Sequence, residues 1–262
     1  MNLKSNNPFL NSKSVAKTTT VTESYDAEGR PINIIDYNNT MTINGAVNKT
    51  LILLVLLLFG AFTTWMMIMS GANYLIPTIG GAVLGFVAVL AASFKPSASP
   101  YLAPAYALFE GLFIGGISML FEAMYPGVVI KAVSATFVTF GVCLALYRFR
   151  IVKVTEQFKS VVMAATLAIA TYYLISWILS FFINFTPVHS VQDNSLLGIG
   201  VSIFVVIIAA LNIFLDLDFI EKGTERRLPK YMEWFGAMGL MVTLVWLYVE
   251  FLRLISKISG RD

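Results

Sequence analysis

Four acidic residues lie inside long apolar stretches of the chain, where a charge is unfavourable in lipid: Glu110, Asp216, Asp218 and Glu250. A carboxyl group shielded from water can take up or release a proton, and two carboxyls held together can share one. Carboxylate oxygens are also the ligands that calcium prefers. This pattern predicts either a pH-dependent latch between helices or a site on a cation pathway.

The two aspartates are expected to differ in role, because residues two apart on a helix face opposite sides. Asn212 precedes Asp216 by one helical turn and shares its face, whereas Lys222 follows Asp218 by one turn and can pair with it. Asp218 is therefore expected to form a structural salt bridge. Asp216 has no local cation and is the stronger functional candidate.

Depth in the membrane suggests how the acids could combine. With a rise of about 1.5 Å per residue, Glu110 lies roughly 13 Å into a helix that begins near Tyr101. Asp216 is expected in the same half of the membrane, so the two could form a weak calcium site. The hydroxyl of Tyr106, one turn before Glu110, could instead bond that acid. Glu250 is expected in the other half of the membrane, near the end of its helix. The other charged residues expected at that depth are Glu122, Lys131 and Arg253.

Composition indicates the kind of element that carries these residues. Hydrophobic residues make up 57% of the chain and charged residues 13%, a balance that a soluble fold of this length cannot bury. A spanning helix needs about 20 apolar residues. The sequence therefore predicts an all-α membrane protein, a bundle of seven transmembrane helices. The expected spans are about 48–70, 74–94, 101–124, 127–147, 160–185, 195–219 and 231–256.

Small residues at four-residue spacing predict close contacts between these helices, because lipid offers no hydrophobic drive for association. The pairs are Gly81 with Gly85 and Gly111 with Gly115. The region 47–262 is thus expected to be one membrane domain. Residues 1–46 read as a polar, disordered tail.

Lys and Arg residues gather on one side of the predicted membrane, and the positive-inside rule places that side, with the N-terminus, in the cytoplasm. They are Lys49, Lys95, Arg148, Arg150, Lys153, Lys159, Lys222, Arg226, Arg227 and Lys230. The basic residues after Glu250 oppose this bias, because seven crossings place them outside. A last segment that enters the membrane and returns would remove the conflict, so both forms of the last helix stay open.

Several function classes are disfavoured by the sequence. A net charge of +3 without a basic stripe gives no reason to expect a nucleic-acid partner. One histidine and one cysteine leave no zinc-ligand cluster, and no HExxH motif or intramembrane-protease signature is present. We therefore expect no enzyme activity and no resident cofactor. The expected partners are the lipid bilayer, calcium ions and protons, with protein partners unknown.

Four segments carry a resemblance to a known family. They are MTINGAVNKT before the first helix, APAYALFEGLFIGGIS, ALNIFLDLDFIEKG and PKYMEWFGAMGLMVTLVWLYVEFLRLI. Over about residues 41–257 the chain resembles the Bax inhibitor-1/YccA family of membrane proteins, in its bacterial branch with a long soluble N-terminus. The resemblance implies a seven-helix bundle with a central last helix in the bacterial cytoplasmic membrane. It also implies a pH-controlled calcium leak through an acidic pair, here Asp216 and Glu250.

Two departures from the family pattern leave alternatives open. Glu250 stands where the family usually has aspartate, and a straight last helix would separate Asp216 from Glu250 by roughly 20 Å in depth. Glu110 could instead complete the site with Asp216. For the whole protein, the sequence favours a pH-sensitive calcium-leak channel or a calcium- and proton-coupled transporter. The alternative is a membrane adaptor or stress-response protein that acts through protein partners. In that case the acidic residues within the helices only stabilise the structure.

Overall fold

The computed structural model describes residues 21–25, 31–35, 39–182, 190, 193 and 195–261. Within these residues, seven helices are long and apolar enough to cross a membrane. They are α2 (Ile43–Met69), α3 (Leu75–Phe94), α4 (Ser99–Met124), α5 (Val128–Arg148), α6 (Glu156–Leu179), α7 (Leu196–Glu225) and α8 (Met232–Ser259). A short 3-10 turn, η2 (Pro96–Ala98), joins α3 to α4. The predicted all-α seven-helix bundle is confirmed.

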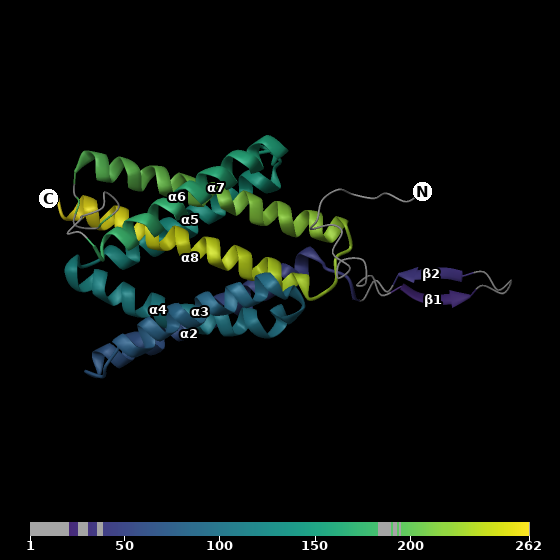
Figure 1. The fold of residues 1–262 in the computed structure, drawn as a ribbon, viewed down its shortest axis with the longest axis horizontal. Coiled ribbons are helices and arrows are strands. Elements are labelled where there is room, and N and C mark those ends of the chain that lie inside the picture. Colours follow the sequence, from purple (N-terminus) through teal and green to yellow (C-terminus); the bar gives the residue numbers. More distant parts are fainter. Residues whose placement is uncertain are drawn as a thin grey trace.

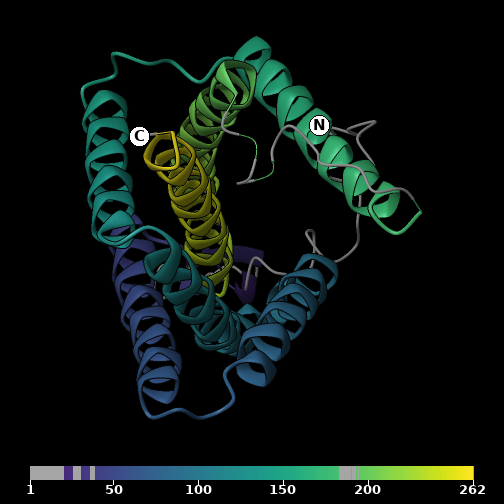
Figure 2. The same ribbon diagram turned by 90° about the vertical axis from the view of Figure 1, so that its left-hand side faces the viewer.

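The last helix lies at the centre of the bundle, as the resemblance implied. α8 packs against α2, α4, α5 and α7, and in the end view of Figure 2 it runs inside the other helices. In its most apolar window 56% of the residues are buried, against 17% in α6. α8 also crosses the bundle without turning back (Figure 1), so the alternative of a re-entrant last segment is wrong.

Glycines bring α4 against two neighbours, as the four-residue spacing predicted. A Cβ added at Gly81 or Gly85 would strike α4, meeting the Phe109 carbonyl oxygen or the Glu110 carboxylate. A Cβ at Gly111 or Gly115 would strike the backbone of α2. Such contacts replace side-chain interdigitation by direct backbone packing, which lets the apolar helices associate inside lipid.

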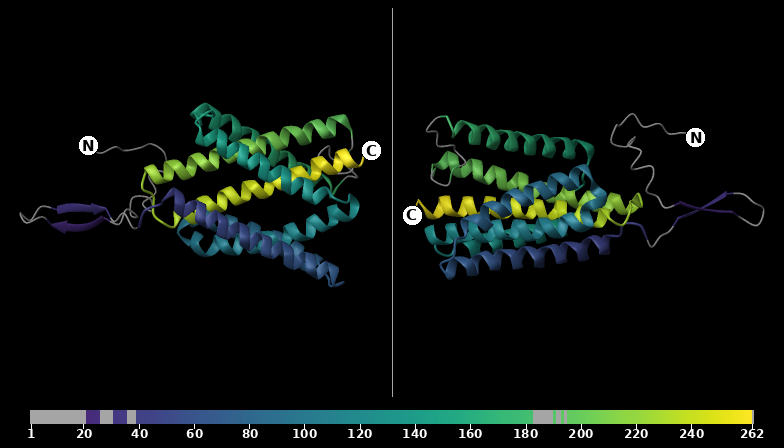
Figure 3. Two further views of the ribbon diagram at one scale, coloured as in Figure 1. Left: turned by 180° about the vertical axis from the view of Figure 1, so that it is seen from behind. Right: turned by 60° about the horizontal axis from the view of Figure 1, so that its bottom comes forward.

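The N-terminal region departs from the expected disordered tail. Strands β1 (Val21–Tyr25) and β2 (Pro31–Ile35) form an antiparallel hairpin, with Val21 opposite Ile35. The hairpin lies beyond one end of the bundle (Figure 3). The prediction for residues 1–20, 26–30 and 36–38 falls outside the described residues.

The first spanning helix begins five residues earlier than expected, at Ile43 rather than near Asn48. Thr42 caps it, because its hydroxyl accepts a hydrogen bond from the Gly45 N–H at 3.0 Å. Just before this cap, the chain pairs with the loop between α7 and α8. The Met41 N–H donates to the Leu228 carbonyl at 2.7 Å, and the Lys230 N–H donates to the Asn39 carbonyl at 3.0 Å.

Candidate functional site

Asp216 lies on α7 and faces the central helix α8. Its Oδ1 atom is 3.6 Å from the position that a Cβ would occupy at Gly239, which is an ordinary van der Waals distance and places the carboxyl group against α8. The Thr243 hydroxyl, one turn further along α8, gives it a hydrogen bond. Its Oδ2 atom is buried and has no hydrogen-bond partner among the described residues. Asp216 thus has one carboxyl oxygen without a donor in the described part of the chain, and a buried polar atom of this kind needs a functional or structural reason.

Asn212 shares a helix face with Asp216 in the sequence, but it serves another contact. Its amide nitrogen donates to the Thr166 hydroxyl of α6 and to the Ile208 carbonyl, both at 2.8 Å. It therefore joins α7 to α6, while Asp216 points to α8. The expected polar stripe is divided between two interfaces.

Asp218 is paired, as the spacing to Lys222 predicted. Its Oδ2 lies 2.9 Å from the Lys222 ammonium and 2.9 Å from that of Lys159 on α6. The second lysine could not be found from helical spacing, because it belongs to another helix. With two cations on one buried carboxylate, Asp218 holds the adjoining ends of α6 and α7 together.

Glu110 lies between α3 and α4, where Gly85 makes room for its carboxylate. It is partly buried. Among the described residues it makes no ion pair, and no hydrogen bond from Tyr106 or another group reaches it. The Glu110 carboxylate and the Oδ2 atom of Asp216 thus both lack a hydrogen-bond partner within the described residues, and both acids lie on helices, α4 and α7, that contact α8.

Glu250 lies near the far end of α8 and is only 1% exposed. Its Oε1 accepts hydrogen bonds from Arg253 at 2.9 Å, from the Tyr173 hydroxyl at 3.1 Å and from the Trp246 indole at 3.2 Å. The Arg253 guanidinium also lies over the Tyr173 ring, 5.3 Å from its centroid. The expected association of Glu250 with Arg253 is present. Glu122 has another task, because its carboxylate accepts from the Gly127 and Val129 N–H groups at the start of α5.

The structure does not bring the candidate acids into one site. No hydrogen bond or ion pair among the described residues joins Asp216 to Glu250 or to Glu110. The part of the chain that the structure describes holds no group of three or more acidic, histidine or cysteine side chains that could bind a metal ion. No direct contact therefore joins the members of the expected pair, or Asp216 and Glu110, in this arrangement, in which Asp216 lies against α8.

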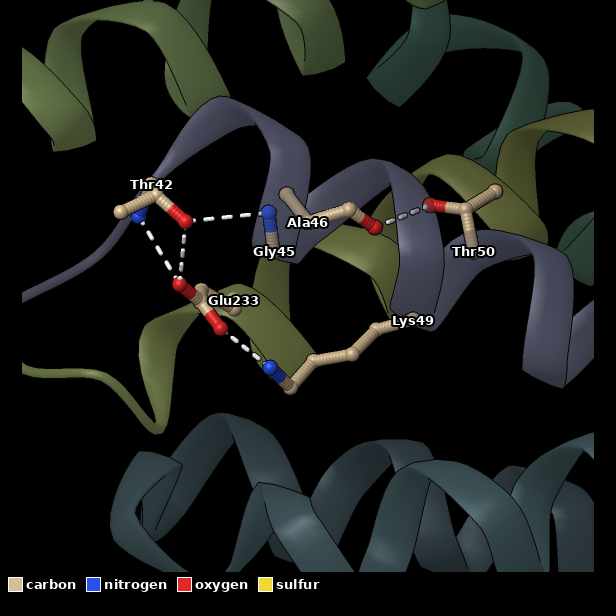
Figure 4. A network of polar contacts seen from close by, with 6 residues as sticks. All are labelled: Thr42, Gly45, Ala46, Lys49, Thr50 and Glu233. Atoms are coloured by element: carbon tan, nitrogen blue, oxygen red, sulfur yellow. Dashed lines mark hydrogen bonds and ion pairs between the residues drawn. The ribbon is translucent and has the colours of Figure 1, made fainter.

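Sequence reasoning missed a polar contact at the start of α8. Glu233 is fully buried and accepts hydrogen bonds at 2.9 Å from both the N–H and the hydroxyl of Thr42. Its other oxygen pairs with the Lys49 ammonium, as Figure 4 shows. We call Glu233, Thr42 and Lys49 the clasp, which fastens the start of α2 to the start of α8. No pattern in the sequence indicates this contact, because an acid in the first turn of a helix is equally well explained by the helix dipole.

A second missed contact lies at the opposite end of the bundle. Lys257 is fully buried, and its ammonium donates to the Gly198 carbonyl in the first turn of α7 at 3.1 Å. Nearby, the Ser195 N–H donates to Asp193 at 3.0 Å. Hydrogen bonds from the Ser195 side chain and backbone hold the pKa of the Asp193 carboxyl below its usual value. Both ends of α8 are therefore fixed by buried charged side chains.

Comparison with protein-family models decides the family. The model described as Bax inhibitor 1 like matches residues 7–260. The chain belongs to the Bax inhibitor 1 like family. No curated protein sequence is significantly similar to it. As a member of this family with seven apolar spanning helices, the protein is an integral membrane protein that resides in a lipid bilayer.

Proposed function

We propose that this member of the Bax inhibitor 1 like family is a calcium-leak protein whose conductance depends on the protonation of Asp216. The observation that carries the proposal is the buried Oδ2 atom of Asp216, which has no hydrogen-bond partner at the contact between α7 and α8. A buried carboxyl without a cation is most easily kept neutral. Loss of its proton would place an uncompensated charge against the central helix.

The mechanism follows from the packing of α7 on α8. With a neutral Asp216, the carboxyl fits against Gly239 and Thr243 and the two helices stay in contact. Ionisation makes this apolar contact unfavourable, because the charge gains solvation only if water or a cation reaches it. The ionised form then favours a wetted, open gap between α7 and α8. Leak should therefore rise as pH rises, with protons closing the path.

The remaining acids take different places in this scheme. Glu110, also without a partner, is proposed to attract cations toward the same path once α8 moves. Asp218 and Glu250 are already compensated by cations, at 2.9 Å each, and serve to hold helices together. We further propose that the protein lies in the bacterial cytoplasmic membrane with its N-terminus in the cytoplasm, which puts Asp216 in the inner half. No catalysis is part of the proposal.

The test is calcium flux into dye-loaded proteoliposomes across a range of pH. Wild type should leak more at higher pH, and Asp216→Asn, which mimics the neutral acid, should leak at a low rate that no longer depends on pH. Asp218→Asn is the matched control, because it lies two residues away on α7 and its parent acid is paired. A folded Asp216→Asn protein with the wild-type pH profile would sink the assignment.

One observation favours the adaptor alternative. The hairpin of β1 and β2 stands beyond the end of the bundle, where a soluble partner could reach its unpaired edges (Figure 3). Absence of flux from the wild type, together with a stable partner that is lost when residues 21–35 are deleted, would support that role and would reject the channel.

A further inference from the structure

An apolar cavity lies between α2 and α5, at the end of the bundle where α4 turns into α5. Its volume is about 390 Å³, and α4 and α8 form its floor. Along α5 it extends from Val129 to Phe137, which corresponds to about 12 Å of helix. No residue of this cavity belongs to the set of acids described above. Its apolar lining includes Leu58, Phe62, Val129, Val133, Phe137 and Val245.

The three hydroxyl groups of the cavity have hydrogen bonds within the protein. Ser118 bonds the Ile114 carbonyl in its own helix, and the Tyr248 hydroxyl lies 2.7 Å from the Ser118 oxygen. Thr136 donates to the Ala132 carbonyl at 2.8 Å. A buried water needs about three polar partners, and these groups offer it little beyond what they already use. The cavity is therefore suited to apolar matter and not to water.

The cavity opens sideways toward lipid. Leu58, Phe62 and Phe137 line it and are 53%, 62% and 47% exposed. They lie in the middle of helices that span the membrane, so the medium that their exposed surfaces face is hydrocarbon. An occupant can thus enter from the bilayer without crossing a polar layer.

We propose that this cavity is a binding site for one hydrocarbon chain of a bilayer lipid. An empty apolar space deprives its lining of dispersion contacts, and a chain that enters restores them. A much smaller apolar cavity in another protein, about 150 Å³, stays dry and takes up benzene. The length along α5 and the lateral opening fit an extended chain whose headgroup stays at the membrane surface.

The site shares its floor with the helix that faces Asp216. Met241, Val245 and Tyr248 lie on one side of α8, and Gly239 and Thr243 lie on the other. A bound chain therefore fills space behind α8, on the face away from α7. Binding itself does not depend on the proposed function, although occupancy would limit how far α8 can move from Asp216.

The experiment counts bound lipids by native mass spectrometry. Protein purified in mild detergent is mixed with phosphatidylglycerol of defined chain length, and lipid occupancy is compared among wild type, Val133→Trp and Val138→Trp. Val133 lines the cavity, whereas Val138 on the same helix is 66% exposed and does not. We expect one retained lipid on the wild type and on Val138→Trp, and about tenfold lower occupancy on Val133→Trp, because the indole fills the space.

Equal lipid occupancy in all three proteins would overturn the proposal, as would a wild type that retains no lipid. A dimeric wild type that Val133→Trp converts to a monomer would also overturn it, since the occupant would then be a second copy. If Val133→Trp does not give a monodisperse protein, Val129→Phe one turn earlier provides a smaller filling with the same expected loss. Calcium flux is not part of this readout, so its outcome leaves the channel proposal untouched.

Discussion

Asp216 and Glu250 are both acids at contacts of the central helix, yet their surroundings are opposite. Glu250 has three donors on one oxygen, including the Arg253 guanidinium at 2.9 Å. Asp216 has the Thr243 hydroxyl and a buried Oδ2 atom for which the described residues provide no hydrogen-bond donor. A compensated charge fixes its helices in one arrangement, whereas an uncompensated carboxyl leaves its contact sensitive to a single proton. The bundle therefore has a fixed region near Glu250 and a responsive region near Asp216.

The largest effect should come from removing the compensated acid. Glu250→Ala leaves Arg253 without its carboxylate and removes the acceptor for Tyr173 and Trp246, so we expect a loss of about 3 kcal/mol or more in stability. The unfolding midpoint in detergent, followed by circular dichroism, measures it. Glu250→Ala with a wild-type midpoint would show that the two regions do not differ in this way.

A substitution in the clasp should have the second largest effect on stability. Glu233→Gln keeps an acceptor for Thr42 but loses the charge that faces Lys49, and we expect destabilisation of about 1–3 kcal/mol. The matched control is Glu225→Gln on the exposed last turn of α7, which should leave the midpoint unchanged. Equal midpoints for the two variants would mean that the clasp does not stabilise the start of α8.

Asp216→Asn should change stability much less than either of these, by no more than about 1 kcal/mol, because no ion pair is lost. The expected sign is neutral or stabilising, since an amide avoids the burial of a charge. Thermal unfolding at neutral and at acidic pH measures this, with Asp218→Asn as the variant that should destabilise. A large loss of stability in Asp216→Asn would mean that another group stabilises the Asp216 carboxylate. It would contradict the difference proposed between Asp216 and Glu250.

Substitution of Asp193, at the end of the bundle where Lys257 lies, should have the smallest effect on stability. Its pKa is lowered in the folded protein, so its contribution to stability is present above the unfolded pKa of about 3.9 and is lost as pH falls through the lower folded value. Wild type should therefore lose slightly more stability than Asp193→Asn between about pH 5 and pH 3. Identical acid sensitivity in the two proteins would contradict the hydrogen bonds from Ser195 as the cause.

Elements set by local composition could be predicted, and contacts between distant segments could not. Apolar length determined the seven helices, and helical spacing found the pairing of Asp218 with Lys222. Lys159 remained hidden because it reaches Asp218 from α6. The early start of α2 was missed because Glu233, far along the chain, receives the hydrogen bonds of Thr42.

The candidate site shows the same division. The sequence singled out Asp216 because it has an apolar context and no local cation, and its buried oxygen without a partner agrees with that reasoning. Its partner could not be derived. Pairing with Glu250 or Glu110 depends on how α4, α7 and α8 cross, and this is decided by contacts between helices that lie far apart in the sequence. Helical rise predicted a separation of roughly 20 Å in depth between Asp216 and Glu250, and no hydrogen bond or ion pair joins the two among the described residues.

The pairing of residues 39–41 with the loop between α7 and α8 couples the position of residues 39–41 to that of the central helix α8. The antiparallel bridge of Thr40 with Pro229 and the clasp together attach residues 40–42 to the first turn of α8 on both sides of the start of α2. A force that displaces residues 39–41 would thus also act on the first turn of α8 inside the bundle. A protein or ligand that moves residues 39–41 would then change the position of α8 without entering the membrane.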